Sequence, residues 1–206
     1  MATGSGDTQI VRFLQQECAR LRDENRLLLD EIHNLRRYIR ALTDLQETVQ
    51  RFTPEQDVLT LLDDTLISAM NLLDTTDGSL MLVDEETDEL VFVLVHGSVS
   101  EVLPGHRFDR RQGIAGWAAE QKKPAIINNV RTDSRFLPAI DEYAGFETRS
   151  LIAVPLVARG RVLGIIEVLN KRSGEEFTQD DASLLSILAT ISASALDYAA
   201  STENQR

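Results

Sequence analysis

The chain has 206 residues, of which 43% are hydrophobic, and its formal net charge at pH 7 is -12. This hydrophobic content is typical of a globular protein and too high for a disordered chain. The excess of acidic residues argues against a nucleic-acid-binding protein, because such a protein needs surplus Lys and Arg to neutralise phosphates. We therefore expect a folded protein with no nucleic-acid partner.

The start of the chain and its cysteine content favour a cytoplasmic protein. The first residues, MATGSGD, contain neither the basic nor the apolar region of a signal peptide. No apolar run approaches the roughly 20 residues needed to cross a bilayer. The single cysteine, Cys18, excludes an internal disulfide framework. We expect no insertion into a membrane.

A heptad repeat of apolar residues extends from Val11 to Val49. The a positions are Val11, Cys18, Asn25, Ile32, Ile39 and Gln46, and the d positions are Leu14, Leu21, Leu28, Leu35, Leu42 and Val49. β-branched residues at a with Leu at d favour a coiled coil of two parallel strands, and a buried Asn at a fixes its register. The alternative is an amphipathic helix packed on the chain's own domain, which would want more apolar residues at e and g. We predict a disordered segment at residues 1–9 and the coiled coil of a homodimer at 10–50.

The residues after the heptads predict a helix and then a β-hairpin. The sequence TPEQ at Thr53–Gln56 has Thr at the N-cap, Pro at the first helical position and Gln where a capping box needs it. A helical face of apolar residues then extends to about Asp74. Two strand-like runs follow, Ser79–Val83 and Leu90–Val95, and the acidic turn DEETDE joins them.

A second hairpin and a long helix complete the pattern. The two strands are expected at Ser150–Ala158 and Arg161–Leu169, with Pro155 at a sheet edge or a bulge because it lacks an N–H donor. The last helix is expected to begin near Thr178, with Asp181 at its third position. These elements predict an α+β fold, an antiparallel sheet with helices covering one face, at residues 51–200, followed by a tail at 201–206.

The stretch GIAGWAAEQKKPAIINN begins a predicted helix with Gly113 and Gly116. The N–H groups of its first turn could hold an anionic group of a ligand, or the glycines could simply allow a sharp corner beneath Trp117. Residues 101–150 contain eight basic and seven acidic residues, whereas residues 51–100 contain one and eleven. The helix start therefore lies in the least acidic part of the protein, which is compatible with an anion.

Several segments, in this order, resemble the GAF domain, the small-molecule sensing module of phosphodiesterases, cyclases and bacterial signalling proteins. They are GIAGWAAEQKKPAIINNV, DSRF, YAGFETRSLIAVPL, GIIEVLNK and EEFTQDD, and the resemblance covers about Pro54 to Ala200. Cyclic-nucleotide-binding members have a motif in which a Lys pairs with an Asp behind the pocket. Asn170, Lys171, Phe177 and Asp181 fit that motif, but Ala182 stands where it has Glu.

The resemblance implies a ligand pocket between the sheet and the connection from Asn129 to Thr148. The residues that match pocket positions of the family are Ser79, His96, Ile114, Ala115, Asp141, Thr148 and Glu167. Leu137 and Ala144 depart from the family, because they are apolar where polar or aromatic contacts are common. The polar matches also have structural interpretations, such as a salt bridge for Glu167 or a helix cap for Asp141.

The residue types favour a protein that is not an enzyme and needs no cofactor. The predicted domain lacks the cysteines that GAF enzymes use to reduce methionine sulfoxide, and His96 and His106 do not have a zinc-binding spacing. One hypothesis is a dimeric signalling protein whose GAF domain senses a small molecule, with a cyclic nucleotide as the first candidate, and acts on a protein partner in trans. The other is a ligand-free GAF scaffold that works through protein–protein interaction.

Overall fold

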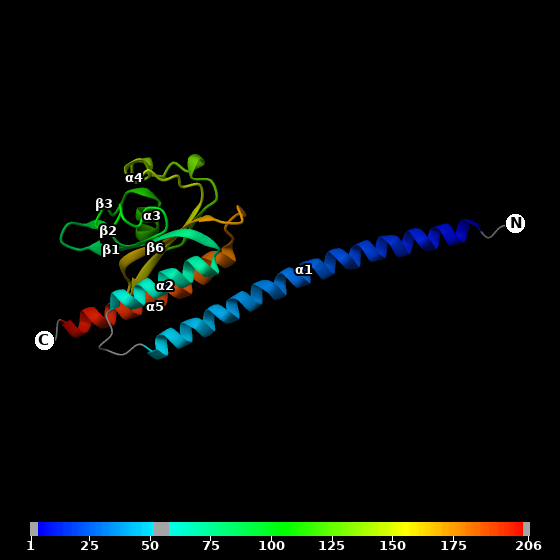
Figure 1. The fold of residues 1–206 in the computed structure, drawn as a ribbon, viewed down its shortest axis with the longest axis horizontal. Coiled ribbons are helices and arrows are strands. Elements are labelled where there is room, and N and C mark those ends of the chain that lie inside the picture. The colour runs from blue at the N-terminus through cyan, green and yellow to red at the C-terminus, as the bar shows by residue number, and fades with distance from the viewer. Residues whose placement is uncertain (1–3, 52–57, 204–206) are drawn as a thin grey trace. The chain divides into compact units, whose positions relative to one another are not determined.

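The computed structural model describes residues 4–51 and 58–203, and it divides into two compact units between Asp44 and Leu45. The first unit consists of the long helix α1 (Gly4–Arg51), drawn in blue in Figure 1, up to Asp44, and the last turns of this helix are counted with the second unit. This helix begins at Gly4, inside the segment predicted to be disordered. The described side chains at its a and d positions, including Val11, Leu14 and Ile32, are exposed in the single chain.

The second unit contains a six-stranded antiparallel sheet in the order β3-β2-β1-β6-β5-β4. Its strands are β1 (Thr75–Asp84), β2 (Glu89–His96), β3 (Arg107–Asp109), β4 (Ala125–Ile127), β5 (Leu151–Ala158) and β6 (Arg161–Lys171). The two predicted hairpins, β1–β2 and β5–β6, are confirmed, and β1 pairs with β6 at the centre of the sheet. The edge strands β3 and β4 escaped prediction because three residues are too few to show an alternating pattern.

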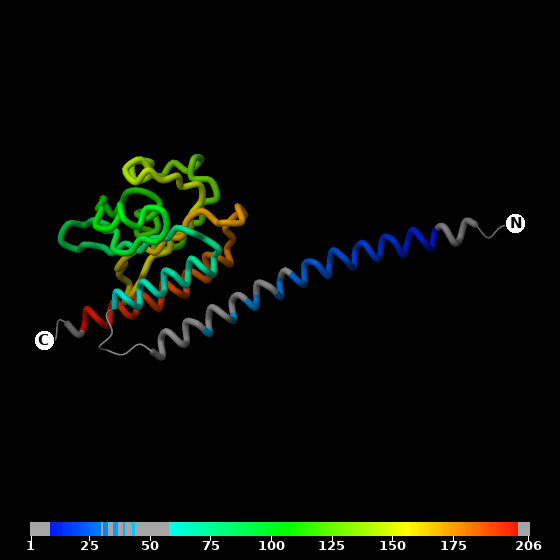
Figure 2. The backbone as a smooth tube through the Cα atoms, viewed as in Figure 1, coloured from blue at the N-terminus to red at the C-terminus, as the bar shows by residue number. Residues whose placement is uncertain are grey.

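Two helices cover one face of the sheet, which confirms the α+β prediction. Figures 1 and 2 show α2 (Val58–Leu72) and α5 (Gln179–Glu203) side by side beneath the strands. The core between helices and sheet consists of fully buried aliphatic side chains: Leu62, Leu66, Leu80, Ile166, Leu185 and Leu188. The predicted helix start at Thr53–Gln56 lies outside the described residues.

The predicted cap of α5 is confirmed. The hydroxyl of Thr178 accepts the N–H of Asp181 at 3.2 Å, and the carboxylate of Asp181 accepts the N–H of Thr178 at 2.9 Å. Pro155 also lies where it was expected, because β4 pairs only with Leu151–Ala153 and β5 bulges after Leu156.

One helix corrects an expectation about membranes. Gln179–Ser201 of α5 is, by length and composition, apolar enough to cross a bilayer, although the sequence was expected to contain no such segment. Leu185 and Leu188 of this helix are fully buried, and the helix packs against β5 and α2. It is therefore a core helix of the domain.

The opposite face carries shorter helices and the long connection. These are α3 (Gly113–Gln121), η1 (Val130–Thr132) and α4 (Pro138–Ala144). α3 packs over β5 and β6 through Ala115, Ala118 and Ala119, and α4 lies farther from the strands. The space left between them and the sheet is the candidate site.

Candidate functional site

A cavity lies on the sheet face that α2 and α5 leave uncovered. The volume of this cavity is about 80 Å³, and a single water molecule requires roughly 10–15 Å³ of such volume. Its floor is formed by β1, β2 and β6, its walls by α3 and the loop after β2, and its cover by the connection that contains α4. The hollow is large enough for a small organic molecule.

All the residues that the sequence predicted for the site line this one cavity. They are Ser79, His96, Ile114, Ala115, Asp141, Thr148 and Glu167. The departing residues Leu137 and Ala144 line it as well. The fold thus brings together five separate stretches of chain, and the binding of a ligand by these residues stays a prediction.

Glu167 is the most unusual residue of the cavity. Its position in β6 pairs with Ser79 of β1 on one side and Ala153 of β5 on the other, so all three share the cavity face. The residue is 9% exposed, and among the described residues its carboxyl group has no hydrogen-bond or ionic partner. Burial raises the pKa of Glu167 to about 7. The salt bridge considered from the sequence is therefore absent within the described part of the chain.

Asp77, which the sequence did not single out, is a second buried acid in the lining. Its carboxylate accepts hydrogen bonds from the Ser98 hydroxyl at 2.7 Å, the Ser98 N–H at 3.0 Å and the Thr76 hydroxyl at 2.6 Å. Burial acts to raise the pKa of Asp77, but these hydrogen bonds outweigh it and the pKa lies below its usual value. Asp77 holds the loop after β2 in place, and its role depends on a contact that no local pattern reveals.

Asp141 and Thr148 are bonded to each other. One oxygen of the Asp141 carboxylate accepts the Thr148 hydroxyl at 2.7 Å, and the other accepts the Thr148 N–H at 2.8 Å. Together they tie α4 to the residues just before β5. A second contact holds the same helix, because the Tyr143 ring stacks on the His106 ring with centroids 4.5 Å apart. α4 is thus fastened over the cavity at two points.

His96 is committed to a different partner. Its Nε2 lies 2.6 Å from a carboxylate oxygen of Asp63, which belongs to α2. Asp63 thus engages one nitrogen of the imidazole, while the residue also borders the cavity, and its contact with a ligand stays a prediction.

The two glycines of α3 are required by its backbone. Gly113 has φ +75°, and a Cβ on Gly116 would lie 2.5 Å from the carbonyl carbon of Arg111. The first hydrogen bond of the helix runs from the Gly116 N–H to the Gln112 carbonyl, so the N–H groups of Gly113, Ile114 and Ala115 have no partner within the helix. The sharp corner is therefore real, and the donors for an anion are present beside it.

The basic residues that suggested an anion lie elsewhere. Arg107 pairs with Asp84 at 2.6 Å, Arg110 and Arg111 pair with Asp88, and Arg131 pairs with Glu147. Of the described residues that line the cavity, three are acidic, and none is Lys or Arg. The basic side chains of residues 101–150 therefore do not line the cavity, although the charge of Arg149 acts on the lining residue Asp77.

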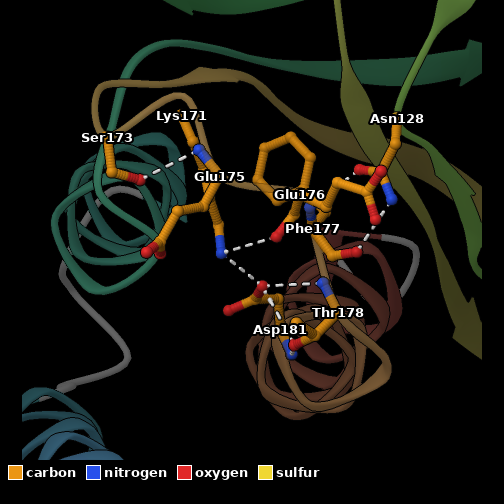
Figure 3. Close-up of polar contacts among 8 residues, drawn as sticks. All are labelled: Asn128, Lys171, Ser173, Glu175, Glu176, Phe177, Thr178 and Asp181. Atoms are coloured by element: carbon orange, nitrogen blue, oxygen red, sulfur yellow. Dashed lines mark hydrogen bonds and ion pairs between the residues drawn. The ribbon is translucent and has the colours of Figure 1, made fainter.

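Behind the sheet, the Lys–Asp pair of the motif is confirmed. Lys171 Nζ donates to Asp181 Oδ2 at 2.6 Å and to the Glu176 carbonyl at 3.3 Å (Figure 3). Asn128 and Phe177 exchange two hydrogen bonds beside them, at 2.7 and 3.0 Å. Lys171 and Asp181 are both buried, and neither lines the cavity. The motif therefore maintains the fold next to the site.

Asn170 connects this motif to the cover of the cavity. Its side chain accepts the Arg149 N–H at 2.9 Å and donates to the Glu147 carbonyl at 2.9 Å. The residue has φ +52°, a backbone conformation that Asn tolerates better than most residues. Asn170 thus fixes the chain where the connection returns to the sheet.

Sequence reasoning missed most of the apolar lining. The missed residues come from β2, β3, the loop after β2 and the connection: Phe92, Val95, Val99, Leu103, Phe108, Phe136, Ile140 and Phe146. Alternation along β2 could have indicated Phe92, but it would have placed Val95 on the opposite face, because it does not reveal the register shift in the pairing of β2 with β1. The loop residues have no periodicity, and only the closed fold brings them to the cavity.

Comparison with known families agrees with this fold. Residues 55–197 match the GAF domain family. Since the match covers more than half of the chain, the protein belongs to the GAF domain family.

The curated relatives include cyclic nucleotide phosphodiesterases. The chain is 30% identical over 151 residues to the probable 3′,5′-cyclic phosphodiesterase pde-5 of Caenorhabditis elegans, covering 67% of this chain and 21% of that protein. It is 31% identical over 150 residues to the dual 3′,5′-cyclic-AMP and -GMP phosphodiesterase 11A of Takifugu rubripes, covering 68% of this chain and 16% of that protein. The chain thus corresponds to a small part of these relatives, their GAF regulatory region, and this homology is consistent with a signalling or ligand-sensing role.

A solved structure supports the fold independently. The GAF domain from a phosphoenolpyruvate-protein phosphotransferase of Coxiella burnetii superposes with a TM-score of 0.70 over 81% of this chain and 98% of that chain. The two sequences are 18% identical, so this likeness concerns the fold alone.

Proposed function

We propose that this chain is a non-enzymatic, dimeric regulatory protein whose GAF domain senses a small molecule and acts on a protein partner in trans. The observation that carries the proposal is the cavity, where the residues that match the family's pocket positions meet around a buried Glu167 for which the described residues provide no partner. A buried polar group without a partner is costly, and a bound ligand would supply that partner. We place this function in the cytoplasm.

A cyclic nucleotide is the first specific ligand to test, because the matched relatives act on cyclic nucleotides by name. The experiment is calorimetric titration of the full chain with cyclic AMP, cyclic GMP and a metabolite panel, together with native mass spectrometry of the purified protein. Glu167→Ala and Asp141→Ala are expected to weaken binding, whereas Glu142→Ala, an exposed acid on the same helix as Asp141, is expected to leave it unchanged.

A ligand-free scaffold is the alternative, and one observation favours it. Asp141 and Thr148 satisfy each other, so these two polar residues need no ligand. A protein that purifies without a bound molecule and binds nothing in the titrations would support the scaffold and contradict the sensor.

The dimer is proposed to form through a parallel coiled coil of α1. Its support is the heptad pattern together with the exposure of the apolar side chains on this helix. Light scattering is expected to give a dimer at micromolar concentration, and a monomer would contradict the proposal. Asn25→Leu is expected to raise thermal stability and broaden the range of oligomers, because a buried Asn exchanges stability for register.

Cys18 offers a direct test of the helix direction. At an a position of a parallel pair, each Cys18 would face its counterpart, and the oxidant diamide would join the two thiols as a disulfide while taking up their two hydrogens. A covalent dimer that reductant reverses is expected on non-reducing gels. A monomer band that persists after oxidation would indicate antiparallel or out-of-register helices.

A further inference from the structure

The charge of the cavity lining indicates which class of ligand it accepts. Its acidic residues are Asp77, Asp141 and Glu167, and its described lining contains neither Lys nor Arg. We propose that the cavity binds a small organic cation, with an ammonium or amidinium nitrogen against Glu167 and Ser79 and an apolar body among the surrounding rings. This inference rests on the proposed function, because it assigns a charge class to the molecule sensed in this cavity.

The three acidic side chains differ in whether the described residues already provide them with hydrogen-bond partners. Asp77 is bonded to Ser98 and Thr76, and both oxygens of Asp141 are bonded to Thr148. Glu167 is the one for which the described residues provide no partner. An N–H donor with a positive charge would give its carboxylate both a hydrogen bond and an ion pair, the combination that a buried carboxylate needs.

The geometry of the sheet leaves room for that donor. Glu167 is flanked on the cavity face by Ser79, whose hydroxyl has no described partner, and by Ala153, whose side chain is a single methyl group. An amidinium group, whose N–H donors form a fork, or an ammonium group, which has three N–H donors, can hydrogen-bond to the carboxylate and to the hydroxyl at the same time. The end of the cavity at β1 and β6 is therefore its polar end.

The rest of the lining suits an apolar body. Phenyl rings reach the cavity from β2, β3 and the connection, through Phe92, Phe108, Phe136 and Phe146. The rings of Phe92 and Phe108 lie 5.8 Å apart and tilted at 42°. Such rings bury a planar group well, and their faces also attract cations.

The lining of the cavity is electrostatically less favourable for an anionic ligand. Arg107 and Arg135, which precede the lining residues Phe108 and Phe136, are paired with Asp84 and Asp133. Arg149, which follows Thr148, is not in the lining, but its charge acts on Asp77. The N–H groups at the start of α3 and the charge of Arg149, which acts on Asp77, would stabilise a negative charge, while the three acidic residues of the lining would repel it.

The binding of the cation should also depend on whether Glu167 is protonated. Burial raises the pKa of Glu167 to about 7, and a bound cation favours the ionised form. The other titratable groups around it are Asp77 on β1, Asp141 on α4 and His96 on β2, and His96 is paired with Asp63 of α2. Ionisation of Glu167 alone would make the affinity for a permanent cation about tenfold higher at pH 8 than at pH 6.

The experiment compares three isosteric probes on the full chain: benzamidine, which is a cation, benzamide, which is neutral, and benzoate, which is an anion. Isothermal titration or ligand-observed NMR at pH 6 and pH 8 measures their affinities. We expect benzamidine to bind at least tenfold more tightly than benzoate, with the pH dependence given above. Glu167→Gln should abolish the pH dependence and the preference for benzamidine over benzamide, whereas Asp180→Asn, an exposed acid of α5, should preserve both.

The outcomes distinguish the proposed charge class of the ligand from the proposed sensing of a small molecule. Benzoate or cyclic GMP binding more tightly than benzamidine would overturn the charge class and leave the small-molecule sensor standing. Failure of every probe, together with a purified protein free of bound molecules, would overturn both. If Glu167→Gln does not fold, Ser79→Ala provides the second variant, and unchanged benzamidine affinity in Ser79→Ala would contradict the placement of the nitrogen.

Discussion

The two faces of the sheet differ in whether their buried charged residues have partners. Lys171 and Glu167 lie on the same strand, β6, and both are less than 10% exposed. Lys171 has a carboxylate at 2.6 Å and a carbonyl at 3.3 Å, whereas the described residues offer Glu167 no partner. The face behind the sheet is packed by two long helices, and the other face contains the cavity. Burial alone therefore does not mark a functional site, and the absence of a partner is the more informative feature.

The largest effect is expected from breaking the pair behind the sheet. Lys171→Met leaves the carboxylate of Asp181 buried without its cation, and such a loss costs about 3–5 kcal/mol. Urea unfolding monitored by circular dichroism would measure this change. The control is Lys123→Met, because Lys123 is exposed.

The double variant Lys171→Met with Asp181→Leu sharpens this test. Replacing both charges by apolar groups is often neutral or stabilising, so much of the lost stability should return. A cost below about 1 kcal/mol for Lys171→Met alone would mean that the pair behaves like a surface salt bridge.

A pH-dependent effect is expected from Glu167. Burial raises the pKa of this group from 4.5 in its ordinary state to about 7 in the folded protein, so the folded state holds an additional proton between these values. The stability that this proton confers is present below pH 4.5 and is lost as the pH rises through 7, by roughly 3 kcal/mol in total. Glu167→Gln should remove this decline in urea unfolding at pH 5 and pH 8, and Glu142→Gln should not.

The acidic residues whose pKa values are lowered do not contribute to the change in stability between pH 5 and pH 8. Asp77 and Asp133 have pKa values below 3.8, and their contributions are lost only at lower pH. An unchanged decline in Glu167→Gln would therefore show that Glu167 is ionised at neutral pH in the free protein, contrary to the environment described above.

A smaller effect is expected at the cover of the cavity. Asp141→Ala removes two hydrogen bonds and leaves the Thr148 N–H without an acceptor, at a cost of about 1–3 kcal/mol. Hydrogen exchange should show faster exchange in residues 129–148 but not in β1 or β6. Equal acceleration across the domain would indicate global destabilisation, and Glu142→Ala is the matched control on the same helix.

The smallest effect concerns the second contact of α4. Tyr143→Ala removes the ring stacked on His106, and such ring pairs contribute about 0.5–1.5 kcal/mol. The free energy of unfolding of Tyr143→Ala, Asp141→Ala and the double variant would show whether the two contacts are coupled. Simple additivity would mean that they hold α4 independently.

Much of the site could be predicted from the sequence. The resemblance to GAF domains identified seven lining residues, and the structure places all of them around one cavity. It also identified the Lys171–Asp181 pair, because local motifs on β6 and at the start of α5 carry it. Asp77 was missed because its role depends on its contact with Ser98, and the rings of Phe108 and Phe136 were missed because they lie in short or irregular segments without periodicity.

The sequence by itself determined the elements: the long N-terminal helix, the two hairpins, the cap of α5 and the glycine corner before α3. Each depends on neighbouring residues, through side-chain alternation, capping hydrogen bonds or a backbone angle that only a few residues tolerate. Only the tertiary structure decided which charges are satisfied. It paired Asp77 with Ser98 and His96 with Asp63, kept the arginines of residues 101–150 out of the cavity lining, and gave Glu167 no partner among the described residues. The physical reason is that a charge in the interior depends on partners within a few ångströms, and chain closure brings those partners together from distant positions.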